Sequence, residues 1–273
     1  MPELPEVQTV VDTLSSRIIG LKITEVEVKV EKLIALSTVA DFKAELIGKE
    51  IKGVRRRGKY IIIELSDDKY LIVHLRMTGQ LLYAAQNLEL AKHTHVIISF
   101  ANQHQLRFIN KRKFGRIYLV SDFSEAGSLA ELGPEPLSED FTLDTFKALF
   151  ENRRGIIKNL LLNQKFLAGL GNIYVDEALY LAGIHPLRKA DQISEEELAK
   201  LYQAIRKVLK DGIKHRGTTK WDYVDGSGQA GEHQDYLQVY DRKGKNCYDC
   251  AEQIEKIKVS GRGTYFCPEC QLS

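Results

Sequence analysis

The chain has 273 residues, of which 44% are hydrophobic and 28% are charged. These proportions exclude a disordered chain, and the length allows a sizeable hydrophobic core. At roughly 150 residues per domain, a chain of this length is expected to form two domains. Lysine and arginine number 39 against 37 acidic residues, and this net charge of +2, taken alone, argues against a general polyanion binder. We find no signal-peptide pattern and no apolar run long enough to span a membrane, so we expect a cytoplasmic protein with reduced thiols.

Basic residues nevertheless gather in four short windows that together carry a charge of +19: 52–59, 107–116, 153–165 and 206–220. Acidic residues are segregated as well, with six of them and no base in 125–144. Such segregation can build one basic face for a nucleic acid on a nearly neutral molecule. Separate, merely solvated charge runs are the alternative interpretation.

The first half of the chain has the pattern of a helix followed by a β-rich domain. Apolar residues in 2–18 recur at spacings of three and four, which predicts an amphipathic helix. From 21 to 120 short alternating segments follow, with hairpin signals at 60–75 and 94–109 and a short helix near 40–47. This pattern predicts a β-sandwich or barrel-like domain.

The second half has the pattern of a helical domain. Helical periodicity is found at 138–150, 153–163, 172–182 and 194–214. Glycines at 169 and 171 and a capping Asn172 predict a helix–two-turn–helix unit with backbone N–H groups for a phosphate, although most such caps bind no ligand. Residues 215–235 are rich in glycine and predict a mobile loop.

All four cysteines lie close to the C-terminus in two Cys-x2-Cys pairs sixteen residues apart: Cys247, Cys250, Cys267 and Cys270. This spacing predicts one structural Zn²⁺ held by four thiolates, and a disulfide pair is the weaker interpretation in a reducing compartment. Few residues surround the site, so the metal should supply much of the folding free energy there. Arg262 lies in the turn between two short strands, where it either contacts a phosphate or is simply solvated.

We therefore predict an α+β multidomain protein. Its parts are an N-terminal helix plus β-sandwich domain (2–131), a linker (132–137), a helix–two-turn–helix domain (138–225) and a C-terminal zinc-ribbon finger (238–273).

The N-terminus is itself a candidate reactive group. Removal of Met1, which is usual before proline, would leave Pro2 with a free secondary amine. An α-amine has a pKa of about 7.7–8.0 against about 10.4 for lysine, so it is the better nucleophile at neutral pH. Attack on a sugar C1′ would form a Schiff base, with Glu3 or Glu6 able to protonate the ring oxygen. Proline followed by acids is also an ordinary helix start.

Several motifs occur together in a fixed order. They are Met-Pro-Glu-Leu-Pro-Glu-Val at the start, Arg-Arg-Gly-Lys-Tyr at 56–60, His-Leu-Arg-Met-Thr-Gly at 74–79, Lys-Phe-Gly at 113–115, Gly-Leu-Gly-Asn-Ile-Tyr at 169–174 and the four-cysteine ribbon. In this combination the chain closely resembles bacterial formamidopyrimidine-DNA glycosylase over its whole length. The resemblance implies a monomeric repair enzyme that excises oxidised purines from double-stranded DNA bound across a cleft, and then nicks the strand by β,δ-elimination.

The resemblance also implies residue roles. Pro2 matches the nucleophile, Glu3 the acid for base loss and Glu6 a second carboxylate of the site, whereas Lys59 and Arg262 match residues linked to phosphate binding and to β- and δ-elimination. The matched DNA-binding residues are His74, Met77, His93, Arg112, Phe114, Arg153, Lys158 and Asn172. Of these, Met77, Arg112 and Phe114 would fill the gap left by an extruded base, whose extrusion costs a few kcal/mol.

The chain departs from the family pattern at Asn110-Lys111, where members often carry an Asp-containing pair. The loop at 218–223 falls on the lesion-recognition loop of the family, and its composition varies among relatives. Two other functions stay open at this point. An endonuclease VIII-like enzyme for oxidised pyrimidines usually begins Pro-Glu-Gly-Pro, whereas this chain has Pro-Glu-Leu-Pro. A non-catalytic zinc-ribbon DNA binder would leave Pro2, Glu3 and Lys59 without a role.

Overall fold

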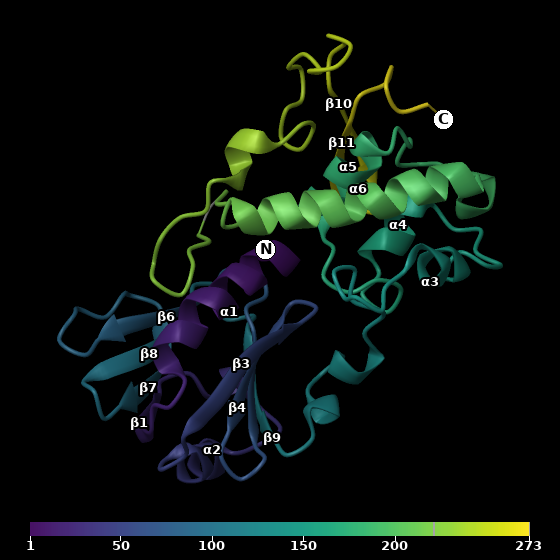
Figure 1. Cartoon of the computed structure of the whole chain (residues 1–273). Helices are drawn as coiled ribbons and strands as arrows, with labels where there is room; N and C mark the ends of the chain where they lie inside the picture. Colours follow the sequence, from purple (N-terminus) through teal and green to yellow (C-terminus); the bar gives the residue numbers. More distant parts are fainter. Residues whose placement is uncertain (221, 273) are drawn as a thin grey trace. The chain divides into compact units, whose positions relative to one another are not determined.

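The computed structural model describes residues 1–220 and 222–272 (Figure 1). Within them the chain forms two compact units, Met1–Glu131 with His215–Gln234 and Leu132–Lys214 with Asp235–Ser273. In the described part of the chain, no helix combines the length and the apolar character that crossing a bilayer requires.

The first unit contains two sheets, as the alternating segments predict. One has the strand order β1-β7-β8-β6 and the other β2-β9-β5-β4-β3, with only β2 and β9 parallel among the pairs. The strands are β1 Ile23–Val28, β2 Ile34–Ala35, β3 Ile51–Arg57, β4 Tyr60–Leu65, β5 Tyr70–His74, β6 Gly79–Ala85, β7 Thr94–Phe100, β8 His104–Asn110 and β9 Arg116–Val120. Both predicted hairpins are confirmed, because β4 pairs with β5 and β7 pairs with β8.

Two helices accompany these sheets, α1 (Leu4–Ile18) and α2 (Val39–Leu46). Figure 1 shows α1 lying over both groups of strands. Its apolar stripe is buried in the same core as side chains of the sheets, which explains the helical spacing in the sequence. The stripe residues are Val7, Val10, Val11, Leu14 and Ile18.

Among its described residues, the second unit contains four α-helices and one hairpin. They are α3 (Leu143–Ala148), α4 (Ile157–Leu162), α5 (Asn172–Leu181), α6 (Glu195–Lys214), β10 (Glu255–Val259) and β11 (Arg262–Phe266). The helices occur where periodicity predicts them, but α3 and α4 are shorter than expected. α3 begins only at Leu143 because the Thr142 hydroxyl caps it, accepting the N–H of Thr145 at 3.2 Å. Asn172 is the first helical residue of α5, and the preceding Gly171 is its N-cap.

The loop after α6 belongs to the first unit, although it follows the helical domain in sequence. Residues 215–234 pack with the sandwich and not with α6. The end of the helical domain at 225 stays a prediction, while the compact units divide the chain at 214. The helices and the zinc-finger hairpin fall into one unit.

Two adjacent acids on α5 attach the finger to the helices. The carboxylate of Glu177 accepts the backbone N–H groups of residues 238, 239 and 240 at 2.8–2.9 Å. Asp176 accepts the N–H of Tyr265 at 2.9 Å. Tyr180, on the same helix, packs into one apolar cluster with Val239 and Cys267. Side chains of α5 therefore supply part of the apolar core of the finger, because the finger is too small to form a sufficient core alone.

Lys158 is buried inside this unit, and its predicted contact with DNA stays a prediction. Its side chain has no exposed surface, and its Nζ donates to Asp176 Oδ1 at 2.5 Å and to Thr264 Oγ1 at 2.7 Å. Removing an ammonium group from water is costly unless an anion compensates it, and Asp176 supplies that anion. Lys158 therefore joins α4 to α5 and β11.

We predict that Lys158→Met lowers the free energy of unfolding by about 3–5 kcal/mol, because the Asp176 carboxylate is then buried without its cation. The double variant Lys158→Met/Asp176→Asn should recover most of this loss, since an amide oxygen can still accept the Tyr265 N–H. Urea unfolding followed by circular dichroism measures both. Equal losses in the single and double variants would contradict this role of the ion pair.

Candidate active site and DNA-binding surfaces

The predicted reactive residues lie buried at the start of α1. Pro2 is buried, and Glu3 and Glu6 are only 3% and 2% exposed. The N–H of Glu3 donates to Glu6 Oε2 at 2.8 Å, which closes the first turn upon itself. Because Pro2 is buried next to this turn, its position relative to the carboxyl groups of Glu3 and Glu6 is fixed.

Glu6 also reaches a distant part of the sequence. Its second oxygen, Oε1, accepts the N–H of Thr218 at 2.7 Å. Two backbone hydrogen bonds stabilise the ionised carboxylate, so Glu6 is better suited to hold Glu3 and Thr218 in place than to donate a proton. Its predicted catalytic role stays a prediction.

Lys59 and His74 are neighbours in the second sheet. Lys59 lies in the tight turn between β3 and β4 and is 6% exposed, while Tyr60, the next residue, pairs with His74. Burial, together with the charges of Arg76 and Lys59, lowers the pKa of His74 to about 3. The neutral ring accepts the N–H of Arg76 on Nδ1 at 3.0 Å. His74 therefore helps to fix the following turn, and its predicted contact with DNA stays a prediction.

The three predicted gap-filling residues lie together on the surface of the first unit. Met77 and Phe114 are 45% and 49% exposed, unlike core residues. The guanidinium of Arg112 lies 4.8 Å from the centre of the Phe114 ring, and its Nη1 is 3.0 Å from Met77 Sδ. An exposed cluster of a thioether, a ring and a guanidinium can insert into a base stack.

Asn110 holds this cluster together, and it was singled out in the sequence only as a departure from the family pattern. It is fully buried, and its Oδ1 accepts the N–H of Lys113 at 2.9 Å and the hydroxyl of Thr78 at 3.2 Å. The Thr78 hydroxyl in turn accepts the N–H of Arg112 at 3.1 Å. A buried side chain thus ties the loop that carries Met77 to the loop that carries Arg112.

Several arginines and lysines of the basic windows are engaged within the protein. Arg107 is 4% exposed and donates to the carbonyls of Ala85, Gln86, Leu88 and Glu89 at 2.9–3.3 Å. Further partners within the described residues are Glu64 for Arg55, the Pro136 carbonyl for Arg206, Asp211 for Lys207 and Asp225 for Arg216. The total of +19 therefore overstates the charge available to DNA. His93 is half-buried, and its carbonyl accepts the Asn110 N–H.

The second unit brings Asn172 next to the finger hairpin. Asn172 Nδ2 donates to the carbonyl of Gly263 at 2.8 Å, beside the exposed Arg262. The hairpin turn is Ser260-Gly261, both with positive φ, so Arg262 opens β11. Two groups able to contact one phosphate are thereby placed close together. Arg153 is exposed in the loop between α3 and α4.

The four cysteine Sγ atoms lie within 4.8 Å of one another. A tetrahedral zinc ion with Zn–S bonds of about 2.3 Å requires sulfur separations of about 3.8 Å. The Cys247–Cys270 and Cys250–Cys267 pairs are separated by 3.8 and 3.4 Å. The backbone N–H groups of Asp249 and Cys270 donate to Cys247 Sγ and Cys267 Sγ, each at 3.4 Å. Such contacts stabilise a thiolate, so the donor set fits one structural zinc ion.

Comparison with known proteins agrees with this construction. Three family descriptions match the chain: formamidopyrimidine-DNA glycosylase N-terminal domain at residues 1–117, formamidopyrimidine-DNA glycosylase H2TH domain at 132–222, and the zinc finger found in FPG and IleRS at 244–272. Formamidopyrimidine-DNA glycosylases from Pelotomaculum thermopropionicum and Desulforamulus reducens are 51% and 46% identical, each over 99% of both chains.

Solved structures give the same result. A complex between the Lactococcus lactis FPG mutant G226P and DNA containing Fapy-dG matches with a TM-score of 0.92 and 41% identity over 100% of both chains. The wild-type Lactococcus lactis enzyme with DNA containing an oxidised pyrimidine matches with a TM-score of 0.92 and 42% identity, again over 100% of both chains.

The fold, the four-cysteine centre and the three family matches together define a zinc-finger protein of DNA repair. Relatives of this identity over nearly the full length place it within that class. The chain belongs to the formamidopyrimidine-DNA glycosylase family.

The buried His74 predicts a pH dependence of stability. Its pKa is about 3 in the folded chain and about 6.5 when unfolded, so between these values the unfolded chain binds more protons. Stability should therefore fall as the pH is lowered from 6.5 towards 3. In His74→Asn, whose amide oxygen can still accept the Arg76 N–H, this slope should be smaller by up to about 1.4 kcal/mol per pH unit. Urea unfolding at several pH values measures it, and identical slopes would contradict the assignment.

Proposed function

We propose that the protein is a bifunctional DNA glycosylase and AP lyase of base excision repair that removes oxidised purines from double-stranded DNA. The observation that carries the proposal is the start of α1, where Pro2 directly precedes two buried carboxyl groups held by backbone hydrogen bonds. We further propose that it acts as a monomer in the cytoplasm, where reduced thiols can bind zinc.

In this mechanism Pro2 acts after Met1 has been removed, because an amide nitrogen is not a nucleophile. The amine lone pair forms a bond to C1′ while the bond from C1′ to the base breaks, and the base leaves with a proton from Glu3. The Pro2 nitrogen then gives its own proton to the Glu3 carboxylate, and its lone pair expels O4′, which takes that proton as the C1′–O4′ bond breaks. The product is an iminium ion joined to Pro2. It makes the C2′ proton acidic, and loss of that proton expels the 3′ phosphate.

A second elimination expels the 5′ phosphate and releases the sugar fragment. Lys59 supports the first elimination and Arg262 the second, both by holding phosphate oxygens. Asn172 shares the phosphate with Arg262, and their proximity within the second unit supports this role. Zinc supplies no reaction step, because four thiolates leave it no open position, but it fixes the hairpin that carries Arg262.

Extrusion of the damaged nucleotide is assigned to Met77, Arg112 and Phe114. Unstacking a base costs a few kcal/mol, and an inserted apolar wedge with a hydrogen-bonding guanidinium offsets this cost. Their exposure and mutual contacts support the assignment. The exposed Arg153 is proposed as a further phosphate contact, and the half-buried His93 as a DNA contact of the first unit.

The proposed preference for oxidised purines rests on membership of the family and on Leu4, because endonuclease VIII-like enzymes usually carry glycine at the corresponding position. A cleavage assay tests it with matched duplexes that contain 8-oxoguanine opposite cytosine, thymine glycol, or no damage. The unsubstituted protein should cleave the 8-oxoguanine strand most rapidly and leave phosphates at both ends of the gap. Undamaged DNA should remain intact.

Two results would contradict the proposal. Faster cleavage of the thymine-glycol duplex would favour an endonuclease VIII-like enzyme. Tight binding of an abasic duplex without any nicking, by a protein that is shown to be folded and zinc-loaded, would favour a non-catalytic DNA binder.

A further inference from the structure

The two loops that carry the gap-filling residues share an uncommon backbone conformation. Arg76, directly before Met77, and Lys113, directly before Phe114, have φ values of 54° and 56°. Residues other than glycine rarely adopt this left-handed region, because it brings Cβ close to the following carbonyl oxygen. Such strain persists only where the surrounding structure imposes it. Each loop is therefore held by contacts beyond its own backbone.

Buried side chains supply those contacts. The N–H of Arg76 donates to His74 Nδ1 at 3.0 Å, and the N–H of Lys113 donates to Asn110 Oδ1 at 2.9 Å. His74 is buried, and Asn110 has no exposed surface. In both loops, a buried acceptor thus orients the strained residue that directly precedes an exposed gap-filling side chain.

The hydroxyl of Thr78 joins the two loops. Its Oγ1 donates to Asn110 Oδ1 at 3.2 Å and accepts the N–H of Arg112 at 3.1 Å. The direction of each bond is determined, because an N–H can only donate and a hydroxyl has one proton to give. The amide oxygen of Asn110 has two lone pairs, which the Lys113 N–H and the Thr78 hydroxyl occupy. We call this chain of bonds from Arg112 through Thr78 to Asn110 the relay.

Close packing behind Phe114 leaves the relay no room to shift. A Cβ added at Gly115 would lie 2.3 Å from Asn110 Nδ2 and 2.5 Å from Phe108 Cζ, so only glycine fits there. The backbone that follows Phe114 therefore lies directly against the Asn110 amide. Movement of Asn110 would consequently displace both Phe114 and the loop that carries Met77.

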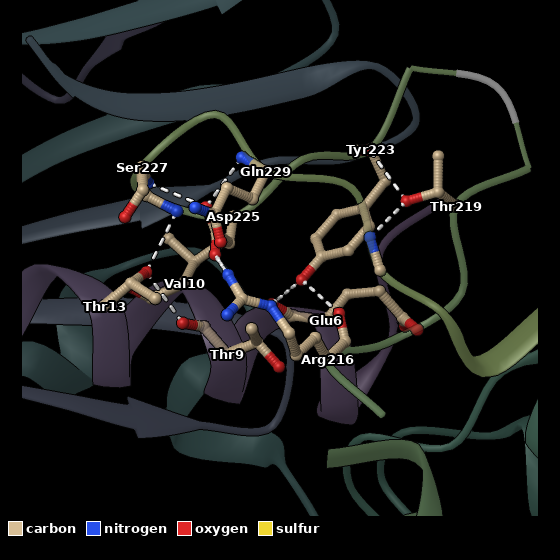
Figure 2. A network of polar contacts seen from close by, with 12 residues as sticks. Glu6, Thr9, Val10, Thr13, Arg216, Thr219, Tyr223, Asp225, Ser227 and Gln229 are labelled. Atoms are coloured by element: carbon tan, nitrogen blue, oxygen red, sulfur yellow. Dashed lines mark hydrogen bonds and ion pairs between the residues drawn. The ribbon is translucent and has the colours of Figure 1, made fainter. Parts of the chain in front are cut away.

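The other long loop of this unit, 215–234, is held by a separate network. Asp225 has a fully buried side chain, whose Oδ1 accepts two backbone N–H groups at 2.8 and 3.0 Å and whose Oδ2 pairs with Arg216 (Figure 2). The Gly226 N–H donates to Thr13 of α1 at 2.9 Å. The described residues of this loop are thus fixed, in contrast to the mobility predicted from its glycines. This network and the relay have no residue in common, so each can be altered by itself.

We propose that Thr78 and Asn110 are positioning residues that hold the three gap-filling side chains in their inserting arrangement before DNA binds. This inference rests on the proposed function. A wedge that is formed in advance loses little conformational freedom on insertion, so it lowers the cost of extruding a stacked base. A preformed abasic nucleotide has no base to unstack. Loss of the relay should therefore slow base excision much more than nicking at an abasic site.

Thr78→Val and Thr78→Ser test the inference as a pair. Valine keeps the shape of the half-buried side chain and loses both relay bonds, whereas serine keeps the hydroxyl. Single-turnover excision of 8-oxoguanine opposite cytosine should fall about tenfold or more in Thr78→Val, because small misplacements near a reacting centre are costly. It should stay within about threefold of the unsubstituted rate in Thr78→Ser, and nicking of an abasic duplex within about twofold in both.

Two further measurements separate positioning from folding. The fluorescence of 2-aminopurine placed beside the damaged nucleotide reports unstacking, and its rise should be slowed in Thr78→Val by a similar factor. Asn110→Ala removes the other end of the same bond. The double variant Thr78→Val/Asn110→Ala should therefore excise no more slowly than Asn110→Ala alone, since both changes break one relay. Urea unfolding checks that each variant is folded.

Thr38→Val is the matched control. The Thr38 hydroxyl caps α2, accepting the N–H of Asp41 at 3.1 Å and donating to its carboxylate at 2.7 Å. This variant should keep the unsubstituted ratio of excision to nicking. An unchanged ratio in Thr78→Val, equal losses of the two activities, or a loss in Thr78→Ser as large as in Thr78→Val would overturn the inference. An unsubstituted protein inactive on both substrates would instead overturn the proposed function, and the inference with it.

Discussion

The carboxylate of Glu6 accepts one backbone N–H bond on each of its two oxygens, and these two bonds determine where the reactive end of the chain lies. The bond from Glu3 closes the first turn of α1, and the bond from Thr218 joins that turn to a loop more than two hundred residues away in sequence. A buried carboxylate is costly unless its oxygens are satisfied, so the helix start and the loop stabilise each other. Pro2 directly precedes this turn, so the position of Pro2 is fixed as well.

The same physical solution recurs in both units, since buried acids receive backbone N–H groups where segments distant in sequence meet. Glu177 receives three N–H groups of the chain that enters the finger, and Asp176 receives one from β11. In the first unit, Glu6 receives one from Thr218. Where a cation is also present, as with Lys158, it compensates the charge in place of water. In the second unit, these buried hydrogen bonds and the ion pair place Arg262 beside Asn172 without requiring a large apolar core in the finger.

Local signals in the sequence were sufficient for the helices, the hairpins and the zinc ligands, because periodicity and Cys-x2-Cys spacing act over a few residues. They were insufficient wherever a side chain's role depends on distant partners. Lys158 lies in a basic window and matches a DNA contact of the family, but its side chain is buried and its charge is compensated by Asp176 in another helix. Arg107 is likewise directed to carbonyls of its own unit. No sequence pattern identified Asp225 as a buried residue, because the glycines around it predict a flexible loop. The contacts of this loop with α1 become visible only in the structure.

The central claim is that the reaction occurs at the nitrogen of Pro2. Reduction of the reacting complex with borohydride, followed by proteolysis and tandem mass spectrometry of the DNA-linked peptide, tests it most directly. The account predicts a peptide that begins at Pro2, without Met1, and carries the sugar remnant on its α-nitrogen. A remnant on Lys59 or on any other side chain, or a linked peptide that retains Met1, would contradict it.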